Sequence, residues 1–487
     1  MPQKLCTSLH NYGKSITFAP KTNFILRLMN KYLLSLSLAV GSIALMAQSL
    51  TPDVLQQLQQ SYQPTVQDRA VRNAIGKTDM RQLVFNQDQL DGYFDTHFTY
   101  RVPQKGITDQ KSSGRCWLFC GLNILRAEMR RTHTDLGDFQ FSQSYLFFYD
   151  QLEKSNLFLQ TVIDTRKLSM DDRKVTSLFQ GPISDGGTFT GVADLVNKYG
   201  LVPQEVMHES YSANNTARMH TVLVLKLREF GLELREMKGT EKQLIDRKNE
   251  QLKTIYRLLC LTLGTPPQEF TWSERNSKDS ILSTDTYTPL AFAEKYTPKS
   301  TTNDYVMMMN DPSREYYKVY EVDMDRHTYE GHNWRYLNVP IEDMQEVAIN
   351  SLKDSSAMYI GCDVGKELDS ERGYLSMDNY DYGSLLGIDF PMDKRQRVLT
   401  HASGSSHAMA LVAVDIQNEK PVKWLVENSW GEKHGWKGHL IMTDEWFHNY
   451  MFRLVAETKY VPERLRAMLT QKPIKLPMWD PMFQAED

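Results

Sequence analysis

The chain has 487 residues, 41% of them hydrophobic and 24% charged, which is ordinary for a soluble globular protein of one large or two to three average domains. Its net charge is −4, and residues 1–47 hold five basic residues and no acidic one, so the rest of the chain has 51 basic against 60 acidic residues. This acidic balance disfavours nucleic acid as the main partner.

Five cysteines are scattered along the chain at Cys6, Cys116, Cys120, Cys260 and Cys362. Their spacing in a long chain argues against a disulfide scaffold. Cys116 and Cys120 resemble half of a zinc site, but no second close Cys/Cys or Cys/His pair completes it. We therefore expect neither a metal nor a cofactor.

The N-terminus has the pattern of a secretory leader. Met29-Asn30-Lys31 is a charged start, and the apolar run Tyr32–Ala47 follows it. This pattern predicts a signal peptide over residues 1–47, with Met29 as a possible true start, and hence export. Leu45 stands where a small residue is usual, so an uncleaved anchor and a cytoplasmic protein remain alternatives. The run is short for a membrane span, and no stable span is expected.

An N-terminal arm is predicted over residues 48–84, ahead of a domain that covers residues 85–487. Thr51-Pro52-Asp53 has the features of a helix start, namely a capping Thr, Pro at the first helical position and an early acid. We expect that helix to continue to about Tyr62.

The stretch from Gln110 to Cys116 carries the first chemical signal. Ser112, Ser113 and Gly114 interrupt any preceding element, and apolar residues at helical spacing predict a helix from Cys116 to about Met129. A thiol at a helix N-terminus is shifted toward the nucleophilic thiolate. The side-chain amide of Gln110 is a suitable donor to an oxyanion. The alternative is that Cys116 is only a small buried residue.

Two glycines follow at Gly186 and Gly187, where a ligand backbone could approach closely. A plain turn is the equally simple reading of this pair. Gly191–Tyr199 is then predicted as a helix that ends at Gly200. The charged, Leu-rich residues from Asn215 to Leu263 predict a helical insertion over about 205–265.

The C-terminal part predicts a β-hairpin that joins a histidine to an asparagine. Ser406–Val414 and Val422–Val426 are apolar runs separated by turn residues, and the midpoint between His407 and Asn428 falls in that turn. Neighbouring strands lie about 5 Å apart, so the two side chains should be within hydrogen-bonding distance. Asn428 would hold the His407 ring while its other nitrogen faces a thiol, and Trp430 would shield that bond from water.

These separate stretches supply a nucleophile, a base and an orienting amide, which together indicate covalent acyl transfer. The expected reaction is thiolate attack on an amide carbonyl, followed by protonation of the leaving amine and hydrolysis of the thioester. His401, His434 and His439 are interpreted as surface or structural histidines.

Six stretches between about residue 85 and the C-terminus resemble the bleomycin hydrolase or aminopeptidase C branch of the papain-like cysteine peptidases. The combination is specific, whereas any one motif alone is not. The stretches are Gln110–Phe119, Ser142–Phe148, Gly361–Lys366, Ser406–Met409, Val426–Gly431 and Leu476–Met482.

The resemblance implies an α+β, papain-like, two-lobed fold with the helical insertion and a C-terminal arm at about 460–487. It implies a thiol-dependent aminopeptidase that acts on peptides with a free N-terminus and assembles as a homohexamer. The roles that it implies are catalytic for Cys116, His407 and Asn428 and oxyanion-binding for Gln110.

In this branch the C-terminal arm lies in its own active-site cleft, so the carboxylate of Asp487 would meet the amine of the substrate. This chain departs from the branch in its bulky, acidic ending Phe483–Asp487 and in its signal-like N-terminus. Two other functions compete with the aminopeptidase. One is a cysteine endopeptidase with an open cleft, and the other is a non-catalytic binding protein on the same fold.

Overall fold

The computed structural model describes residues 49–91, 95–297, 304–480 and 482. The predicted leader and Asp487 lie outside the described residues. The chain divides after Leu83 into two compact units, which are described separately below. In the described part of the chain, no helix is both long enough and apolar enough to cross a membrane.

The described residues of the first unit, 49–83, form the helices α2 (Pro52–Ser61), α3 (Val66–Ile75) and α4 (Met80–Leu83). The predicted helix start is confirmed, since Thr51 caps α2 by accepting a hydrogen bond from the Val54 N–H at 3.3 Å. Thr65 and Asp68 form a reciprocal capping box at the start of α3. None of the three helices has a buried residue, so their ends are stabilised by local caps rather than by a core.

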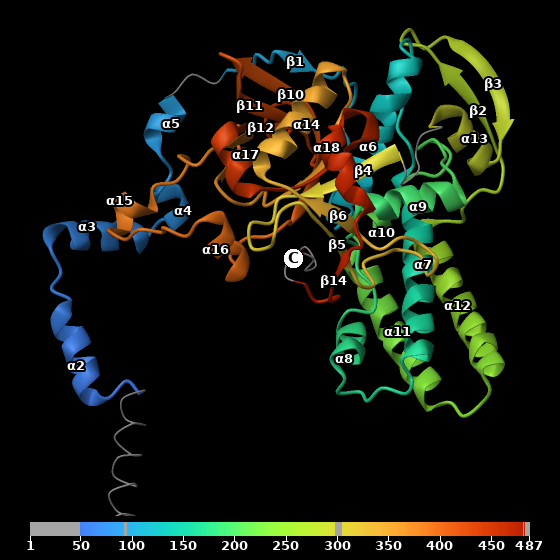
Figure 1. Ribbon diagram of the computed structural model, residues 1–487, viewed down its shortest axis with the longest axis horizontal. Coiled ribbons are helices and arrows are strands. Elements are labelled where there is room, and N and C mark those ends of the chain that lie inside the picture. Colours follow the sequence, from blue (N-terminus) through green and yellow to red (C-terminus); the bar gives the residue numbers. More distant parts are fainter. Residues whose placement is uncertain (1–48, 92–94, 298–303, 481, 483–487) are drawn as a thin grey trace, which may run out of the picture. The chain divides into compact units, whose positions relative to one another are not determined.

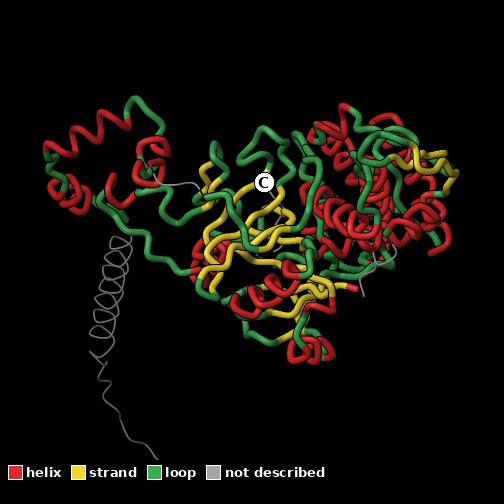
Figure 2. Tube along the Cα trace, turned by 90° about the horizontal axis from the view of Figure 1, so that it is seen from above, coloured by secondary structure: helices red, strands yellow, loops and turns green. Residues whose placement is uncertain are grey.

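The second unit is built on one mixed sheet, whose strands gather in one half of the unit (Figures 1 and 2). In the described residues the strand order is β14-β5-β6-β4-β13-β7-β10-β11-β12-β9-β8, and β1 pairs with β10. The bounds are β1 Tyr100–Arg101, β4 Tyr305–Met309, β5 Lys318–Val322, β6 Arg335–Asn338, β7 Met358–Cys362, β8 Leu368–Asp369, β9 Tyr374–Leu375, β10 His407–Gln417, β11 Lys420–Glu427, β12 His439–Thr443, β13 Met451–Glu457 and β14 Ile474–Leu476.

Long helices make up the other half of this unit, where α7, α11 and α12 lie side by side (Figure 1). The hairpin of β2 (Phe270–Arg275) and β3 (Ile281–Tyr287) adjoins them in sequence. The helices are α5 Gln87–Asp91, α6 Cys116–Thr132, α7 Gln143–Asp164, α8 Arg173–Gln180, α9 Phe189–Tyr199, α10 Tyr211–Asn214, α11 Ala217–Glu236, α12 Glu241–Leu263, α13 Pro289–Tyr296, α14 Ile341–Lys353, α15 Tyr382–Leu386, α16 Lys394–Leu399, α17 Asp444–Tyr450 and α18 Glu463–Arg466, with 3₁₀ turns η2 Thr458–Tyr460 and η3 Ala467–Thr470.

The residues from Asn215 to Leu263 are helical, as their periodicity predicts. Helices α11 and α12 pack against α7 through single apolar stripes, such as Leu223, Leu227 and Leu234 on α11. Helix α6 is different, because it is buried on nearly all sides between α9 and the strands β7 and β10. This position fixes the end of the helix that carries Cys116.

A buried ion pair ties α6 to the sheet. The Arg126 Nη2 donates to Oε1 of Glu427 at 2.7 Å, and both side chains are at most 1% exposed. Burial raises the pKa of the Glu427 carboxyl to about 6, although the guanidinium of Arg126 opposes that shift. Because Glu427 precedes Asn428, this pair fixes the end of β11 relative to α6.

We expect Arg126→Met to lower the free energy of unfolding at pH 8 by about 3–5 kcal/mol, because it leaves the Glu427 carboxylate buried without its partner. The double variant Arg126→Met/Glu427→Leu should recover most of that loss, since both charges are then gone. Urea titration followed by tryptophan fluorescence measures both effects. Lys242→Met, which removes one side of an exposed pair with Asp246, is the control and should cost less than about 1 kcal/mol. An Arg126→Met protein as stable as this control would contradict the prediction.

Candidate active site

The hydrogen bond predicted between the histidine and the asparagine is present. Nε2 of His407, the first residue of β10, lies 2.9 Å from Oδ1 of Asn428, the residue after β11. The hairpin turn is tighter than expected, with only Asn418 and Glu419 between the strands, both at positive φ. The observed register pairs Ala410 with Glu427, so the histidine and the asparagine are diagonal rather than directly opposite neighbours.

This bond determines which nitrogen of the ring can act as a base. Oδ1 of Asn428 accepts, so Nε2 of His407 carries the proton and Nδ1 has the lone pair. The ring of Trp430 lies 5.1 Å from the imidazole, and His407 and Asn428 are 7% and 2% exposed. Burial lowers the pKa of the His407 imidazole to about 4, although the bond to Asn428 raises it. A neutral, oriented imidazole is the state that can accept a proton.

The segment that leads to Cys116 is bound directly to the residues after Asn428. The Gln110 N–H donates to the carbonyl of Ser429 at 2.8 Å, and the Ser429 hydroxyl donates to Oε1 of Gln110 at 2.6 Å. Asp109 forms a backbone bridge with Trp430. The residues before Cys116 and the residues after Asn428 therefore meet, although about 300 residues separate them.

The side-chain amide of Gln110 is fixed on both sides, because its Oε1 accepts from Ser429 and its Nε2 donates to Ser113. Its Nε2 donates one hydrogen to the carbonyl of Ser113 at 2.7 Å, which leaves the second amide hydrogen for another acceptor. Cys116 is the first residue of α6 and is 1% exposed. The dipole of α6 places partial positive charge at its N-terminal end, where Cys116 lies. The arrangement can therefore stabilise negative charge at this end of α6.

Arg115, whose role the sequence alone does not reveal, holds this loop from inside the protein. Its fully buried guanidinium forms two bonds with the Glu209 carboxylate, at 3.2 and 2.7 Å, and its Nε donates to the Ser113 hydroxyl at 3.0 Å. The same group lies over the rings of Phe119 and Phe147. Its partner is 94 residues away, so no local pattern could have identified the pair.

The Gly186–Gly187 loop lies beside the nucleophile. Trp117 Nε1 donates to the carbonyl of Asp185 at 2.6 Å, and a Cβ on Gly187 would stand 2.7 Å from the Trp117 ring. In the described part of the chain the N–H and C=O of Gly187 have no hydrogen-bond partner. Both groups can therefore pair with an extended peptide.

The segment before the C-terminus is fixed close to β10, the strand that carries His407. Asp480 pairs with Arg314, and Nη2 of Arg453 donates to the carbonyl of Met482 at 2.8 Å. Arg453 lies on β13 opposite Gly361 of β7, and Gly361 lies opposite Ala408 of β10. The anchor at Met482 is thus only two strands from the residue that follows His407.

No cluster of three or more metal-binding side chains occurs in the residues that the structure describes. Cys116, Cys120, Cys260 and Cys362 are all thiols. Burial raises the pKa of the Cys120 thiol, so that cysteine is not a competing nucleophile.

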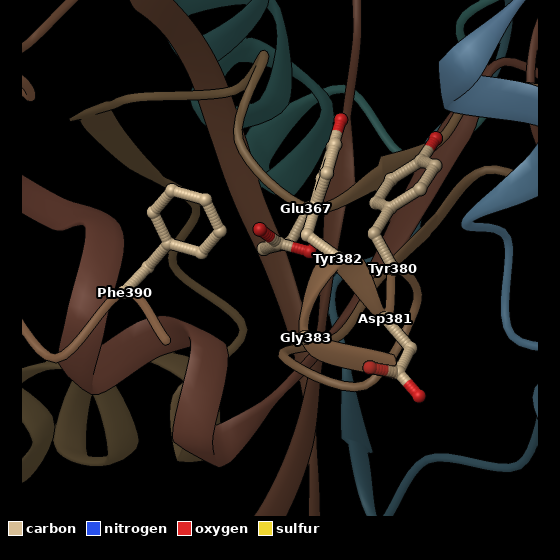
Figure 3. A pocket seen from close by; sticks show the side chains of 6 residues that line it. All are labelled: Glu367, Tyr380, Asp381, Tyr382, Gly383 and Phe390. Atoms are coloured by element: carbon tan, nitrogen blue, oxygen red, sulfur yellow. The ribbon is translucent and has the colours of Figure 1, made fainter. Parts of the chain in front are cut away.

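A separate pocket of about 370 Å³ lies elsewhere on the second unit (Figure 3). Two of its polar groups already serve the fold. The Asp381 carboxylate caps α15 by accepting from the Ser384 N–H at 2.8 Å, and the Tyr380 hydroxyl donates to the carbonyl of Leu368 at 2.7 Å. It contains none of the predicted catalytic residues. The lining residues are Glu367, Tyr380, Asp381, Tyr382, Gly383 and Phe390.

Comparison with known proteins places this geometry in a family. The Peptidase C1-like family matches residues 49–483. Human bleomycin hydrolase is 39% identical over 79% of this chain and 88% of its own length. Aminopeptidase E of Lactobacillus helveticus is 33% identical over 89% of this chain and 99% of its own length. Aminopeptidase C of Lactobacillus delbrueckii subsp. lactis is 36% identical over 81% of this chain and 89% of its own length.

A solved structure shows the same fold. The crystal structure of PepW from Lactobacillus rhamnosis HN001 superimposes with a TM-score of 0.85 at 34% identity, and the match covers 90% of this chain and 99% of that one. The mixed fold is therefore papain-like. The chain belongs to the Peptidase C1-like family, in the bleomycin hydrolase and aminopeptidase C branch, and it is an enzyme of the cysteine aminopeptidase class.

Proposed function

We propose that the protein removes N-terminal residues from peptides with a Cys–His–Asn mechanism, and that its own C-terminal arm restricts cleavage to free N-termini. The observation that supports the proposal is the contact between the Gln110–Cys116 segment and the Asn428–Trp430 segment, because the first carries a thiol and an amide donor and the second carries the asparagine that orients His407.

In the first step the Cys116 thiol transfers its proton to Nδ1 of His407, and the thiolate attacks the carbonyl carbon of the first peptide bond. The carbonyl electron pair moves to oxygen, where the second amide hydrogen of Gln110 and the Cys116 backbone N–H stabilise it. Collapse breaks the C–N bond, and the imidazolium of His407 protonates the leaving amine. The products are a shortened peptide and a thioester.

In the second step water attacks the thioester after giving a proton to His407. The tetrahedral intermediate expels the Cys116 sulfur, which takes that proton back, and the N-terminal amino acid leaves. Asn428 keeps Nε2–H of the ring engaged throughout, so Nδ1 alone exchanges protons.

The length of the C-terminal arm and the charge of its carboxylate both support the proposal that the arm restricts cleavage to free N-termini. The five residues from Phe483 to Asp487 span at most about 17 Å when extended. Two strand spacings, the distance from the Met482 anchor to the His407 strand, are about 10 Å. A C-terminal carboxylate held there would pair with the ammonium of a substrate and set the distance from that charge to the scissile bond.

The proposal includes the assembly of the enzyme and its cellular location. We propose a homohexamer, in keeping with the branch to which the chain belongs, and export of the mature enzyme, on the basis of the leader pattern in residues 1–47. Sedimentation analysis and sequencing of the mature N-terminus test these two points.

We expect Cys116→Ala to abolish hydrolysis of a fluorogenic peptide with a free N-terminus, with loss of at least about 10³-fold in kcat/KM. The reason is that no other group in the site can form the thioester. Cys260→Ala on α12 is the matched control and should keep the full rate. The assay contains a thiol reductant. Equal loss in both variants, or full activity of Cys116→Ala, would contradict the mechanism.

Removal of residues 483–487 should release activity on an N-acetylated version of the same peptide, which the intact protein should leave uncut. The physical reason is that the neutral acetylated terminus cannot pair with the carboxylate of the arm and collides with it instead. Activity on both peptides by the intact enzyme would identify an open-cleft endopeptidase. No activity on any peptide from folded protein would favour a binding protein.

The acid limb of the kcat/KM profile should have its midpoint near pH 4 rather than near the ordinary histidine value of about 6.5. Burial lowers the pKa of the His407 ring, so the neutral ring that accepts the thiol proton predominates above about pH 4 and is lost as the pH falls through that value. Initial rates at low substrate from pH 3.5 to 9 measure the limb. A midpoint at 6 or above would show that the ring is solvated in the free enzyme.

A further inference from the structure

The distance between the Gly186–Gly187 loop and Cys116 is set by contacts on both sides of the nucleophile. A Cβ on Gly114 would stand 3.0 Å from the Cβ of Asp185, and Trp117 donates to the carbonyl of Asp185. The loop therefore touches the residues two before and one after the thiol. Any displacement of the loop changes the width of the space beside Cys116.

Helix α7 holds the same loop from behind. Nζ of Lys154 donates to the carbonyls of Ser184 and Gly186 at 3.0 and 2.6 Å, and the Gln151 amide donates to the carbonyl of Ser184 at 3.1 Å. Lys154 also pairs with Asp150 at 2.9 Å. Because these carbonyls point toward α7, the unpaired N–H and C=O of Gly187 are left for a ligand.

A histidine from another part of the unit closes this arrangement. His327 lies in the connection between β5 and β6, and its Nδ1 is 2.5 Å from Oδ1 of the buried Asp150. The Thr188 N–H donates to its Nε2 at 3.4 Å, so Nδ1 carries the proton. The ring centroid is 4.6 Å from that of Trp117. Through the His327 side chain, the connection between β5 and β6 therefore contacts both α6 and the end of the Gly186–Gly187 loop.

The ring of His327 leaves room only for glycine at two neighbouring positions. A Cβ on Gly187 would stand 2.3 Å from Cε1 of His327, and a Cβ on Gly191 would stand 2.2 Å from its Cδ2. Such contacts are far inside van der Waals distance, so only glycine fits at either place. Gly187 is thus confined between the rings of Trp117 and His327.

The charges in this group are balanced. Burial alone would raise the pKa of the Asp150 carboxyl, but Lys154 and His327 outweigh it and hold that pKa below its usual value. Asp150 is therefore a carboxylate that fixes both the ring and the ammonium. No local sequence pattern indicates this group, because Asp150 and His327 are 177 residues apart.

We propose that His327 is a positioning residue for peptide binding, which sets the Gly186–Gly187 loop at the correct distance from Cys116, with Asp150 fixing its ring. The inference rests on the proposed function. The contacts of His327 are with Asp150, Thr188 and Trp117, so its action is on the peptide-binding wall and not on proton transfer.

The test compares His327→Ala with His332→Ala in the assay for free N-termini. His332 is the matched control, because it lies in the same connection and also pairs with an aspartate, at 2.8 Å to Asp194, but is 67% exposed. We expect His327→Ala to lower kcat/KM on the order of 10–100-fold, mainly through a higher KM. His332→Ala should be unchanged.

A second readout separates loop positioning from an effect on the thiol. The rate of Cys116 alkylation by iodoacetamide should stay within about twofold of the wild type in His327→Ala, because the nucleophile and its base keep their contacts. A fall in alkylation that parallels kcat, with KM unchanged, would overturn the proposal. So would kinetics equal to those of His332→Ala.

Asp150→Asn provides the test should His327→Ala fail to fold. This change keeps the size of the side chain and removes the charge that orders His327 and Lys154, so KM should rise at least about threefold with alkylation unchanged. An unchanged KM in folded Asp150→Asn would overturn the proposal. A wild-type protein that cleaves no peptide would instead contradict the proposed function, so the two failures are distinguishable.

Discussion

The active site depends on the backbone contact between the residues before Cys116 and the residues after Asn428. Gln110 and Ser429 exchange a backbone and a side-chain hydrogen bond, and Asp109 bridges to Trp430. These bonds hold the end of α6 and the end of the hairpin together in the folded protein, and in the proposed mechanism the entropy of aligning thiol and imidazole would be lost during folding rather than during catalysis.

Buried charge pairs surround this contact, and each has its partner in place. Arg126 and Glu427 tie the helix to the hairpin, Arg115 and Glu209 hold the loop before the thiol, and Asp150 pairs with Lys154 behind the glycine loop. Pairs of this kind add little net stability when complete but are costly to break on one side. Their effect is to leave the surrounding loops with one arrangement, which suits a site that depends on distances of a few tenths of an ångström.

The hairpin shows how far sequence reasoning reaches and where it stops. Two apolar runs separated by turn residues located both strands. Because the midpoint between His407 and Asn428 falls in that turn, the two residues were predicted to be neighbours, and the observed register agrees within two residues. The tight turn at Asn418–Glu419 was missed, because neither residue is glycine and a positive φ at such residues is set by strand twist and pairing. The helices at Pro52, Cys116 and Phe189 followed from caps and periodicity.

The sequence by itself determined the chemical class of the site, since a thiol at a helix N-terminus, a strand-borne histidine and an asparagine beyond the turn are local features that short-range rules can identify. Only the tertiary structure decided which residues support them. Arg115, Glu209, Asp150, Lys154 and His327 carry no local pattern, and their partners are mostly tens to hundreds of residues away. The physical reason is that a buried charge is tolerated only where the fold brings it a partner, and that meeting is a property of packing rather than of sequence spacing.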